Sequence, residues 1–472
     1  MSLCLVFTLF SLTFVSSSVS EKYFAQRFIV IFSGYFSEQF RQQTIKTALS
    51  GISFCFSFVP RNYSHGQVIF PTDFELIETV DLNQNDLNLL TSRLLRSEFI
   101  KNVHKDKVIH LHVSQLRQDP NRKKSKKNPL PNDQAADSVL LNPKNQPWKL
   151  LSAPQAAWST GLCGDGVRVG IFDTGLVNAY HYSHFRNANI VERTNWTWRL
   201  KNAKVDTNPS AVDGHGHGTF VSGLIAASIP DLKETSFSDD SCLPLGLAPH
   251  AELYIFRVFT DSQFSMTSWF LDALNYAIAK RLHVINLSIG GPDFMDQPFV
   301  DKVNELSANG ILMVSAIGND GPVFGSPNNP ADQMDVLGVG GVDALGNVAT
   351  FSSRGPTAWE MRDGYGRFKP DIVTWATGVI SSNLDGGCKS LSGTSAASPV
   401  VTGSVALLIN AALSHRPEGR DAPCPSGCPP INPASLKQAI MAGAGPISVE
   451  GRKTASIFEQ GAGMLNLQRS ID

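Results

Sequence analysis

Ser395 stands in a setting that suits a nucleophile. It lies in the small-residue segment Gly393–Pro399, and an apolar, helix-length run from Val400 to Ala412 follows. A hydroxyl at the start of such a helix faces free main-chain N–H groups and the positive end of the helix dipole, which favour a negatively charged oxygen. Pro399 would fit the first helical turn, where its missing N–H costs no hydrogen bond. Because a serine hydroxyl is a weak nucleophile, the chain must also supply a base, an orienting acid and an oxyanion donor.

Asp173 and His217 are the candidates for the acid and the base. Asp173 follows the apolar run Val167–Phe172, at the carboxyl end of a predicted strand, although by itself it could merely cap a turn. His217 lies in the glycine-rich segment Asp213–Phe220 at a predicted helix start, and the glycines let the backbone approach closely. His215 precedes it by two residues, but no third ligand has suitable spacing, so no metal site is predicted.

Asn319 is the candidate oxyanion donor. It follows the predicted strand Ile311–Ala316, and its amide could donate to a substrate carbonyl oxygen beside the N–H of Ser395. By itself the segment Asn319–Gly321 would be read only as a turn. Four such groups, each at a strand end or a helix start of one sheet, predict nucleophilic acyl transfer. Their chain order (Asp, His, Ser) is that of subtilisin and differs from the chymotrypsin and α/β-hydrolase orders.

The elements that must position these residues begin near Trp148, where short apolar strands start to alternate with helices. Strands that are apolar almost throughout have both faces covered, so we predict an α/β fold with a doubly wound parallel sheet. Ligands of such sheets bind beyond the carboxyl ends of the strands. The predicted strands are Val167–Phe172, Leu253–Arg257, Val284–Ile289, Ile311–Ala316 and Val336–Val339. The predicted helices are His217–Ala227, Met266–Lys280, Pro298–Ala308, Ser395–Ala412 and Pro433–Ala442.

Residues 24–114 predict a separate, smaller α+β domain with the ferredoxin-like order β-α-β-β-α-β. Its predicted strands are Phe28–Phe32, Phe54–Val59, Phe74–Val80 and Val108–Val113, and its predicted helices are Ser37–Leu49 and Asn85–Ile100. Residues 115–147 are polar, Pro-rich and include the basic run Arg122–Lys127, which is typical of a linker. A nuclear-localisation patch is the alternative interpretation of that run, but the signal peptide predicted at residues 1–20 argues against it.

Residues 1–20 predict a signal peptide, because the apolar run Leu3–Val15 is followed by small residues. A buried strand is the alternative, since a charged segment before the apolar run is missing. No later stretch reaches the ~18 consecutive apolar residues of a membrane-spanning helix. We therefore expect a luminal or secreted protein. The net charge of −1 argues against nucleic acid or an anionic membrane as the main partner.

Cysteines and glycosylation motifs bear on the compartment. Six cysteines remain beyond the signal peptide, which fits an oxidising environment loosely. Cys424 and Cys428 lie close together and could pair, whereas their spacing lacks the second half of a zinc site. The sequon at Asn195 lies in a polar stretch and is a candidate for glycosylation. The sequon at Asn286 falls in a predicted buried strand and is discounted, and that at Asn62 belongs to the small domain.

The chain resembles the subtilisin-like serine proteases. The matching segments are Asp173-Thr174-Gly175, His217-Gly218-Thr219-x-Val221-x-Gly223, Gly318-Asn319 and Gly393-Thr394-Ser395-x-Ala397-Ser398-Pro399. The resemblance implies that Asp173 orients the imidazole, His217 is the general base, Ser395 the nucleophile and Asn319 the oxyanion donor. It also implies that main-chain groups of Ser288, Ile289 and Gly290 pair with an extended substrate as an added strand. No cofactor is needed for this chemistry; structural calcium is common in the fold, but no ligands can be assigned from the sequence.

Further segments resemble a luminal, subtilisin/kexin-type branch of the family, among them Glu192–Thr197, Asn286–Asp296, Asn328–Val336 and Phe351–Gly355. The branch implies cleavage of membrane-tethered precursors, such as sterol-regulatory transcription factors, in the endoplasmic reticulum and Golgi after Arg-x-(aliphatic)-x. It makes residues 24–114 the chain's own inhibitory propeptide, 115–147 a processing region and 148–472 the catalytic domain.

Two departures from the family pattern, one cleavage-like segment and two other functions stay open. The segment Arg93–Arg96 matches the cleavage pattern but lies in a predicted helix, whereas Lys107–Leu111, at the propeptide end, lacks the Arg of family processing sites. Members of the branch continue into further luminal domains and a membrane anchor that this sequence does not contain, so we expect a fragment or a soluble form. The alternatives to a processing protease are a non-catalytic binding protein of the same fold and a general degradative protease.

Overall fold

The computed structural model describes residues 26–110 apart from positions 62, 63, 66, 67 and 81, and then 154–178, 182–197, 211–228, 246–291, 297–358, 366–414, 431–448 and 454–472. The predicted signal peptide, the predicted linker, the sequon at Asn62 and the pair Cys424 and Cys428 lie outside the described residues. The described chain divides into two compact units, residues up to Val108 with Met266–Ser268, and the remainder.

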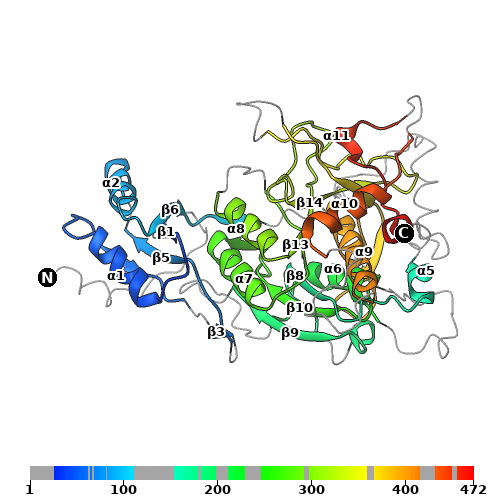
Figure 1. Cartoon of the computed structure of the whole chain (residues 1–472), viewed down its shortest axis with the longest axis horizontal. Helices are drawn as coiled ribbons and strands as arrows, with labels where there is room; N and C mark the ends of the chain where they lie inside the picture. The colour runs from blue at the N-terminus through cyan, green and yellow to red at the C-terminus, as the bar shows by residue number, and fades with distance from the viewer. Residues whose placement is uncertain are drawn as a thin grey trace, which may run out of the picture. The chain divides into compact units, whose positions relative to one another are not determined.

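The first unit is built on a four-stranded sheet with the order β2-β5-β1-β6. Its central strand β1 is antiparallel to both neighbours. This is the predicted ferredoxin-like arrangement (Figure 1). The strands are β1 (Gln26–Phe32), β2 (Phe56–Phe58), β5 (Phe74–Thr79) and β6 (Ile100–Lys105), the helices are α1 (Glu38–Ala48) and α2 (Gln84–Leu94), and β3 (Ser64–His65) with β4 (Val68–Ile69) adds a short hairpin.

Two boundaries predicted for this unit are wrong. The helix predicted to reach Ile100 ends at Leu94, because the buried residues Leu94 and Ile100 are six positions apart and do not share a helical face. The fourth strand is therefore β6, which begins at Ile100, and not the predicted strand at Val108–Val113. The segment Val108–His110 forms a separate short strand, β7. Arg93–Arg96 lies at the end of α2 with Leu94 fully buried, so the cleavage-like pattern is not in an extended, accessible segment.

The second unit contains a seven-stranded sheet with the order β15-β14-β13-β12-β8-β10-β9. Every neighbouring pair in it is parallel. The structure thus confirms the predicted doubly wound parallel α/β sheet. The strands are β8 (Arg168–Asp173), β9 (Ile190–Asn195), β10 (Glu252–Arg257), β12 (Val284–Leu287), β13 (Leu312–Ala316), β14 (Val336–Val342) and β15 (Ile372–Trp375).

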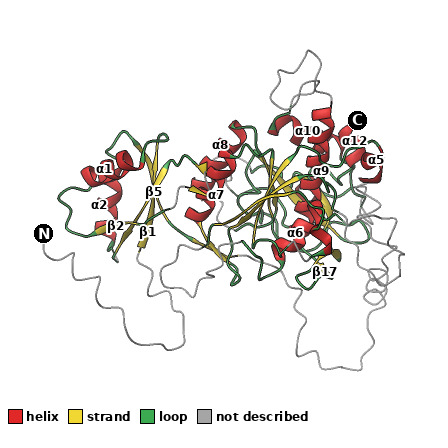
Figure 2. Cartoon of the chain, turned by 90° about the horizontal axis from the view of Figure 1, so that it is seen from below, coloured by secondary structure: helices red, strands yellow, loops and turns green. Residues whose placement is uncertain are grey.

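Helices cover both faces of this sheet. Figure 2 shows α6 and α9 on one side and α7 and α8 on the other. The larger helices are α6 (His217–Ala226), α7 (Thr267–Ala279), α8 (Gln297–Ala308), α9 (Thr394–Ser414) and α10 (Pro433–Gly443), and the short ones are α5 (Pro154–Ser159), α11 (Ile457–Gln460) and α12 (Leu467–Ile471). A short strand β11 (Phe264–Met266) precedes α7, and β16 (Val379–Ser382) pairs with β17 (Cys388–Leu391) in a hairpin.

Helix α9 is the centre of the large core. Its apolar side chains pack with those of β8, β12, β13, β14 and α6 in one buried cluster. Among the described residues it alone is long and apolar enough to cross a membrane, but 89% of its most apolar window is buried in the unit. Because the helix is wrapped by strands and helices of its own unit, burial in the core accounts for its composition.

The two edge strands of the sheet, β9 and β15, were not predicted. Strand β9 mixes polar residues with apolar ones, because it pairs on one side only and is partly exposed. Strand β15 has only four residues, so its apolar run is too short to be distinctive.

The predicted surface position of Asn195 is wrong. The residue is 2% exposed, and its Oδ1 accepts hydrogen bonds from the main-chain N–H and the hydroxyl of Thr197, at 3.0 and 2.8 Å. Its side chain therefore serves a local turn at the end of β9 and does not present an accessible amide to a glycosylating enzyme. Among the described cysteines, Cys163 has a free thiol and Cys388 is disulfide-bonded.

Candidate active site

Asp173 and His217 are in direct contact. Asp173 is the last residue of β8 and His217 the first of α6, and their side chains are each 1% exposed. The imidazole Nδ1 lies 2.8 Å from Asp173 Oδ1 and 2.9 Å from Oδ2. Because an ionised carboxylate can only accept, Nδ1 carries the proton, and Nε2 is left as the basic nitrogen. Nε2 is buried and has no hydrogen-bond partner among the described residues.

Asp213 organises the turn that brings these two residues together. Helix α6 begins after Gly216, which has φ 92° and provides no side-chain cap. The Asp213 carboxylate replaces the missing cap, accepting from the main-chain N–H of Gly216 (2.7 Å) and Thr219 (2.8 Å) and from the Thr219 hydroxyl (2.7 Å). It also accepts from the hydroxyl of Thr174, the neighbour of Asp173, at 2.9 Å. The sequence analysis missed this role, although an acidic residue just ahead of a helix is a recognisable signal.

Ser395 and Asn319 meet beside Gly393. A Cβ atom at Gly393 would lie 3.3 Å from Ser395 Oγ and 3.5 Å from Asn319 Nδ2, so a glycine there keeps the space between the two groups open. Ser395 is the second residue of α9, and its main-chain N–H has no hydrogen-bond partner among the described residues. The N–H of Ser395 and the amide of Asn319 are thus two candidate donors next to Gly393.

Thr394 turns the Asn319 amide. Asn319 Oδ1 accepts from the Thr394 main-chain N–H at 2.9 Å and from its hydroxyl at 3.1 Å. The Thr394 hydroxyl is further bonded to the main chain of Gly318. Since the oxygen of the amide is occupied, the amide N–H₂ is the group left to face a ligand. Thr394 is a second residue whose role the sequence analysis did not assign.

The position of Pro399 differs from the prediction. Helix α9 begins at Thr394, so Pro399 lies in its second turn and not in its first. A residue at this place would normally donate its N–H to the carbonyl of Ser395, four positions earlier. Proline has no N–H, so the carbonyl of Ser395 lacks that bond, and the first turn of the helix is left less constrained at the hydroxyl that would react.

The segment Ser288, Ile289 and Gly290 lies between two paired stretches. The ladders of β12 end at Leu287, and the chain pairs again at Gly291, whose N–H and C=O bond to Asn329. The three residues between them are in no ladder among the described residues, as a segment that pairs with substrate requires.

Ser288 is tied to the helix that carries Ser395. Its hydroxyl accepts from Asn286 Nδ2 at 2.7 Å, and Asn286 Oδ1 accepts from the hydroxyls of Ser398 (2.7 Å) and Thr402 (2.9 Å) in α9. Asn286 is fully buried, in agreement with its being discounted as a glycosylation site.

Two further titratable groups, His215 and Lys389, border His217. The ring of His215 lies 6.4 Å from that of His217, and burial, together with the His217 charge, lowers the pKa of His215. Burial also lowers the pKa of Lys389, on β17, against the nearby carboxylates of Asp213 and Asp173. Among the described residues, no three or more His, Cys, Asp or Glu side chains are grouped so as to hold a metal ion.

The arrangement can support nucleophilic attack by Ser395. His217 Nε2 can accept the hydroxyl proton, Asp173 can stabilise the resulting imidazolium, and the two donors beside Gly393 can receive an oxyanion. The hydrogen bond between His217 Nε2 and Ser395 Oγ is not formed in this structure. Such bonds are often long without a ligand and tighten when substrate binds.

Two protein-family models match parts of this chain. Residues 164–463 match the model of the subtilase family, and residues 23–107 match the N-terminal domain of the membrane-bound site-1 protease family. Human membrane-bound transcription factor site-1 protease is 42% identical over 96% of this chain and 40% of its own length. The subtilisin-like protease SBT6.1 of Arabidopsis thaliana is 48% identical over 71% of this chain and 28% of its own length. The chain thus spans about two fifths of the length of the human relative.

A solved structure shares the fold. The prenylagaramide maturation protease PagA aligns with a TM-score of 0.50 and 22% identity, over 67% of this chain and 96% of the other.

Proposed function

The chain belongs to the subtilase family, and from that membership we propose that it is a serine endopeptidase of the secretory pathway. Its substrates would be luminal segments of membrane-tethered precursors, such as sterol-regulatory transcription factors, cleaved after Arg-x-(aliphatic)-x. Support for the precursor class comes from the 42% identity to a relative named membrane-bound transcription factor site-1 protease. Asp173, His217, Ser395 and Asn319 would act as orienting acid, general base, nucleophile and oxyanion donor.

The observation that carries this proposal is the buried contact between Asp173 and His217. A carboxylate bound to Nδ1 fixes the imidazole in the tautomer whose Nε2 is a base, which is what an otherwise weak serine nucleophile needs. Burying the Asp173–His217 pair costs free energy of folding, and Asp213 accepts five hydrogen bonds that hold the surrounding turn. A protein that does no chemistry with the pair would gain nothing from this arrangement.

The N-terminal unit would be an inhibitory propeptide covering residues 24–114, followed by a processing region at 115–147 and the catalytic domain at 148–472. The match of residues 23–107 to the N-terminal domain of the site-1 protease family supports this division. The lumen of the endoplasmic reticulum or Golgi fits the disulfide bond at Cys388, since such bonds form in oxidising compartments. Ser288, Ile289 and Gly290 would pair with the substrate main chain.

Hydrolysis of matched peptides tests the proposed activity and its specificity. We expect the wild-type chain to cleave Arg-x-Leu-x peptides much faster than peptides in which Ala replaces the Arg, and Ser395→Ala to cleave neither. Equal rates for both peptides would indicate a degradative protease. Equal cleavage by wild type and Ser395→Ala would show that the activity belongs to a contaminant.

A further inference from the structure

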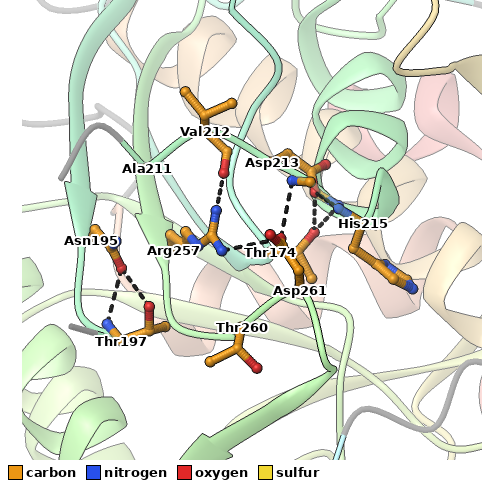
Figure 3. Close-up of polar contacts among 12 residues, drawn as sticks. Thr174, Asn195, Thr197, Ala211, Val212, Asp213, His215, Arg257, Thr260 and Asp261 are labelled. Atoms are coloured by element: carbon orange, nitrogen blue, oxygen red, sulfur yellow. Dashed lines mark hydrogen bonds and ion pairs between the residues drawn. The ribbon is translucent and has the colours of Figure 1, made fainter. Parts of the chain in front are cut away.

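A buried guanidinium lies behind the loop that leads to His217. Arg257 is the last residue of β10, in register with Asp173 on β8 and Asn195 on β9, and its side chain is 1% exposed. It donates to the main-chain carbonyl of Val212 and, at 3.0 Å, to Oδ1 of Asp261. Figure 3 shows the guanidinium between these two acceptors. The guanidinium thus donates to the main chain of the loop and to the carboxylate of Asp261.

Asp261 holds the same loop at a second point. Its Oδ1, which accepts from Arg257, also accepts from the main-chain N–H of Gly214 at 3.1 Å. A Cβ atom at Gly214 would lie 2.5 Å from Asp261 Oδ2, so the carboxylate packs directly on the loop main chain. Val212 and Gly214 are the two neighbours of Asp213. The Arg257–Asp261 pair therefore fixes the main chain on both sides of Asp213.

The loop needs such support, because its conformation is not intrinsically favoured. Ala211 has φ 53°, in the left-handed region that residues with a Cβ seldom adopt. Any shift of Asp213 would displace the main chain next to both Asp173 and His217. The Asp213 carboxylate is bonded to Thr174, next to Asp173, and to Gly216, next to His217. A loosened loop would consequently change the angle and distance between the imidazole and its carboxylate.

We propose that Arg257 and Asp261 are positioning residues that hold Asp213, and through it the imidazole of His217, in register with Asp173. The inference rests on the proposed function for its kinetic consequences, whereas the placement of the imidazole can be measured without activity. The pair differs from a purely stabilising ion pair, because its contacts converge on the two residues that flank Asp213. Burying a charged group for this purpose is costly, and its partner is needed to offset that cost.

Two conservative variants of the full chain separate positioning from stability. Asp261→Asn keeps an oxygen for the Gly214 N–H but removes the charge opposite Arg257. Arg257→Lys keeps a buried cation that cannot donate to Val212 and Asp261 with the same fork geometry. A misplacement of ~1 Å costs about 100-fold in rate. We therefore expect kcat to fall about tenfold in Asp261→Asn and between about tenfold and 100-fold in Arg257→Lys, with KM changed less than about twofold.

The pH profile and an NMR signal give readouts that stability alone does not move. If the hydrogen bond between Asp173 and His217 is longer or poorly aligned, the carboxylate stabilises the imidazolium less. The midpoint of the acid limb of the kcat profile should then move to lower pH in both variants. The proton on His217 Nδ1, observed in histidine-labelled protein, should shift or broaden. Glu192→Gln is the matched control, because it removes the carboxylate of a Lys280 ion pair (2.8 Å) and keeps an acceptor for Tyr276.

Each outcome decides the proposal. It is supported if the Nδ1 proton signal and the acid limb change in Asp261→Asn and Arg257→Lys but not in Glu192→Gln. It is overturned if the two variants lower only the melting temperature, as the control does. If Arg257→Lys does not fold, Asp261→Asn decides alone. If the wild-type chain cleaves no peptide, the proposed function fails, and the Nδ1 signal still shows whether the pair positions His217.

Discussion

At the scale of single residues, the oxyanion side of the site depends on the orientation of one amide. Asn319 Oδ1 is occupied by two hydrogen bonds from Thr394, so its N–H₂ group is the part of the amide left to donate beside Gly393. An amide held in this way is preorganised for charge that appears only in the transition state, which is where such donors contribute most.

Asn319→Ala should lower kcat on the order of 100- to 1000-fold with little change in KM, the effect of losing one oxyanion donor. Thr394→Val should have a smaller effect, about five- to tenfold in kcat, because it removes one neutral hydrogen bond to Asn319 and leaves the donor in place. Steady-state kinetics on one peptide measures both. A larger loss in Thr394→Val than in Asn319→Ala would contradict the assignment of Asn319 as the donor.

The residues that sequence could predict were those that act through their own side chains at the ends of elements. Asp173 and Asn319 follow buried strands, and His217 and Ser395 stand at helix starts, so the parallel sheet alone predicts that they converge. Arg257 could not be assigned in this way, because it donates to a main-chain carbonyl of a loop whose path no periodicity shows. The predicted surface position of Asn195 was wrong for the same reason, since its side chain bonds to the main chain of Thr197 in a buried turn. Asp213 was missed, although its place just ahead of a helix is a recognisable signal.

At the scale of elements, the central strands were predictable because each is apolar almost throughout. The long helices were predictable because each either repeats apolar residues at helical spacing or forms a long apolar run. The edge strands β9 and β15 were not, since an edge position needs less burial and so leaves a weaker pattern. Pro399 lies in the second turn of α9 and not in the predicted first turn, so its missing N–H leaves the carbonyl of Ser395 without its helical hydrogen bond.

Helix α8 carries a pH-dependent contribution to stability. Burial raises the pKa of Glu305 to about 7, from an ordinary 4.5, although Lys302 donates to it at 2.7 Å. The folded chain therefore binds this proton more tightly than the unfolded chain between about pH 4.5 and 7, so stability falls as pH rises through that window. Glu305→Gln should not show this fall and should gain about 1–3 kcal/mol relative to wild type at pH 8.

Thermal or denaturant unfolding at pH 5 and pH 8 measures this difference. Lys302 also donates to Asn275 at 2.7 Å, so the amide variant keeps the lysine bonded and isolates the effect of the carboxylate charge. Parallel stability curves for wild type and Glu305→Gln across this range would contradict the burial argument.

At the scale of the whole molecule, the chain joins a small ferredoxin-like unit to a large unit that holds every candidate catalytic residue. The order of these units in the sequence was predictable, because apolar and polar stretches alternate with different spacing in each. The place of the proposed cut between them was not predictable, since Arg93–Arg96 is partly helical with Leu94 buried and Lys107–Leu111 lacks the Arg of family processing sites.

N-terminal sequencing of secreted protein tests the division into propeptide and catalytic domain. If the large unit cleaves the chain between the two units, the N-terminus of wild-type protein should lie between them. Ser395→Ala should instead retain the small unit and lose only the predicted signal peptide. Identical N-termini for both proteins, beyond Val108, would assign the cut to another protease and contradict self-processing.

Covalent labelling by a fluorophosphonate tests most directly whether Ser395 is an activated nucleophile. The reagent phosphonylates a serine only where a base and oxyanion donors assist, so unmodified surface serines serve as internal controls. Peptide mapping of the labelled wild-type protein should place one adduct on Ser395, and His217→Ala should lose it while remaining folded. Labelling of wild type no faster than Ser395→Ala, or an adduct on another serine, would contradict the account.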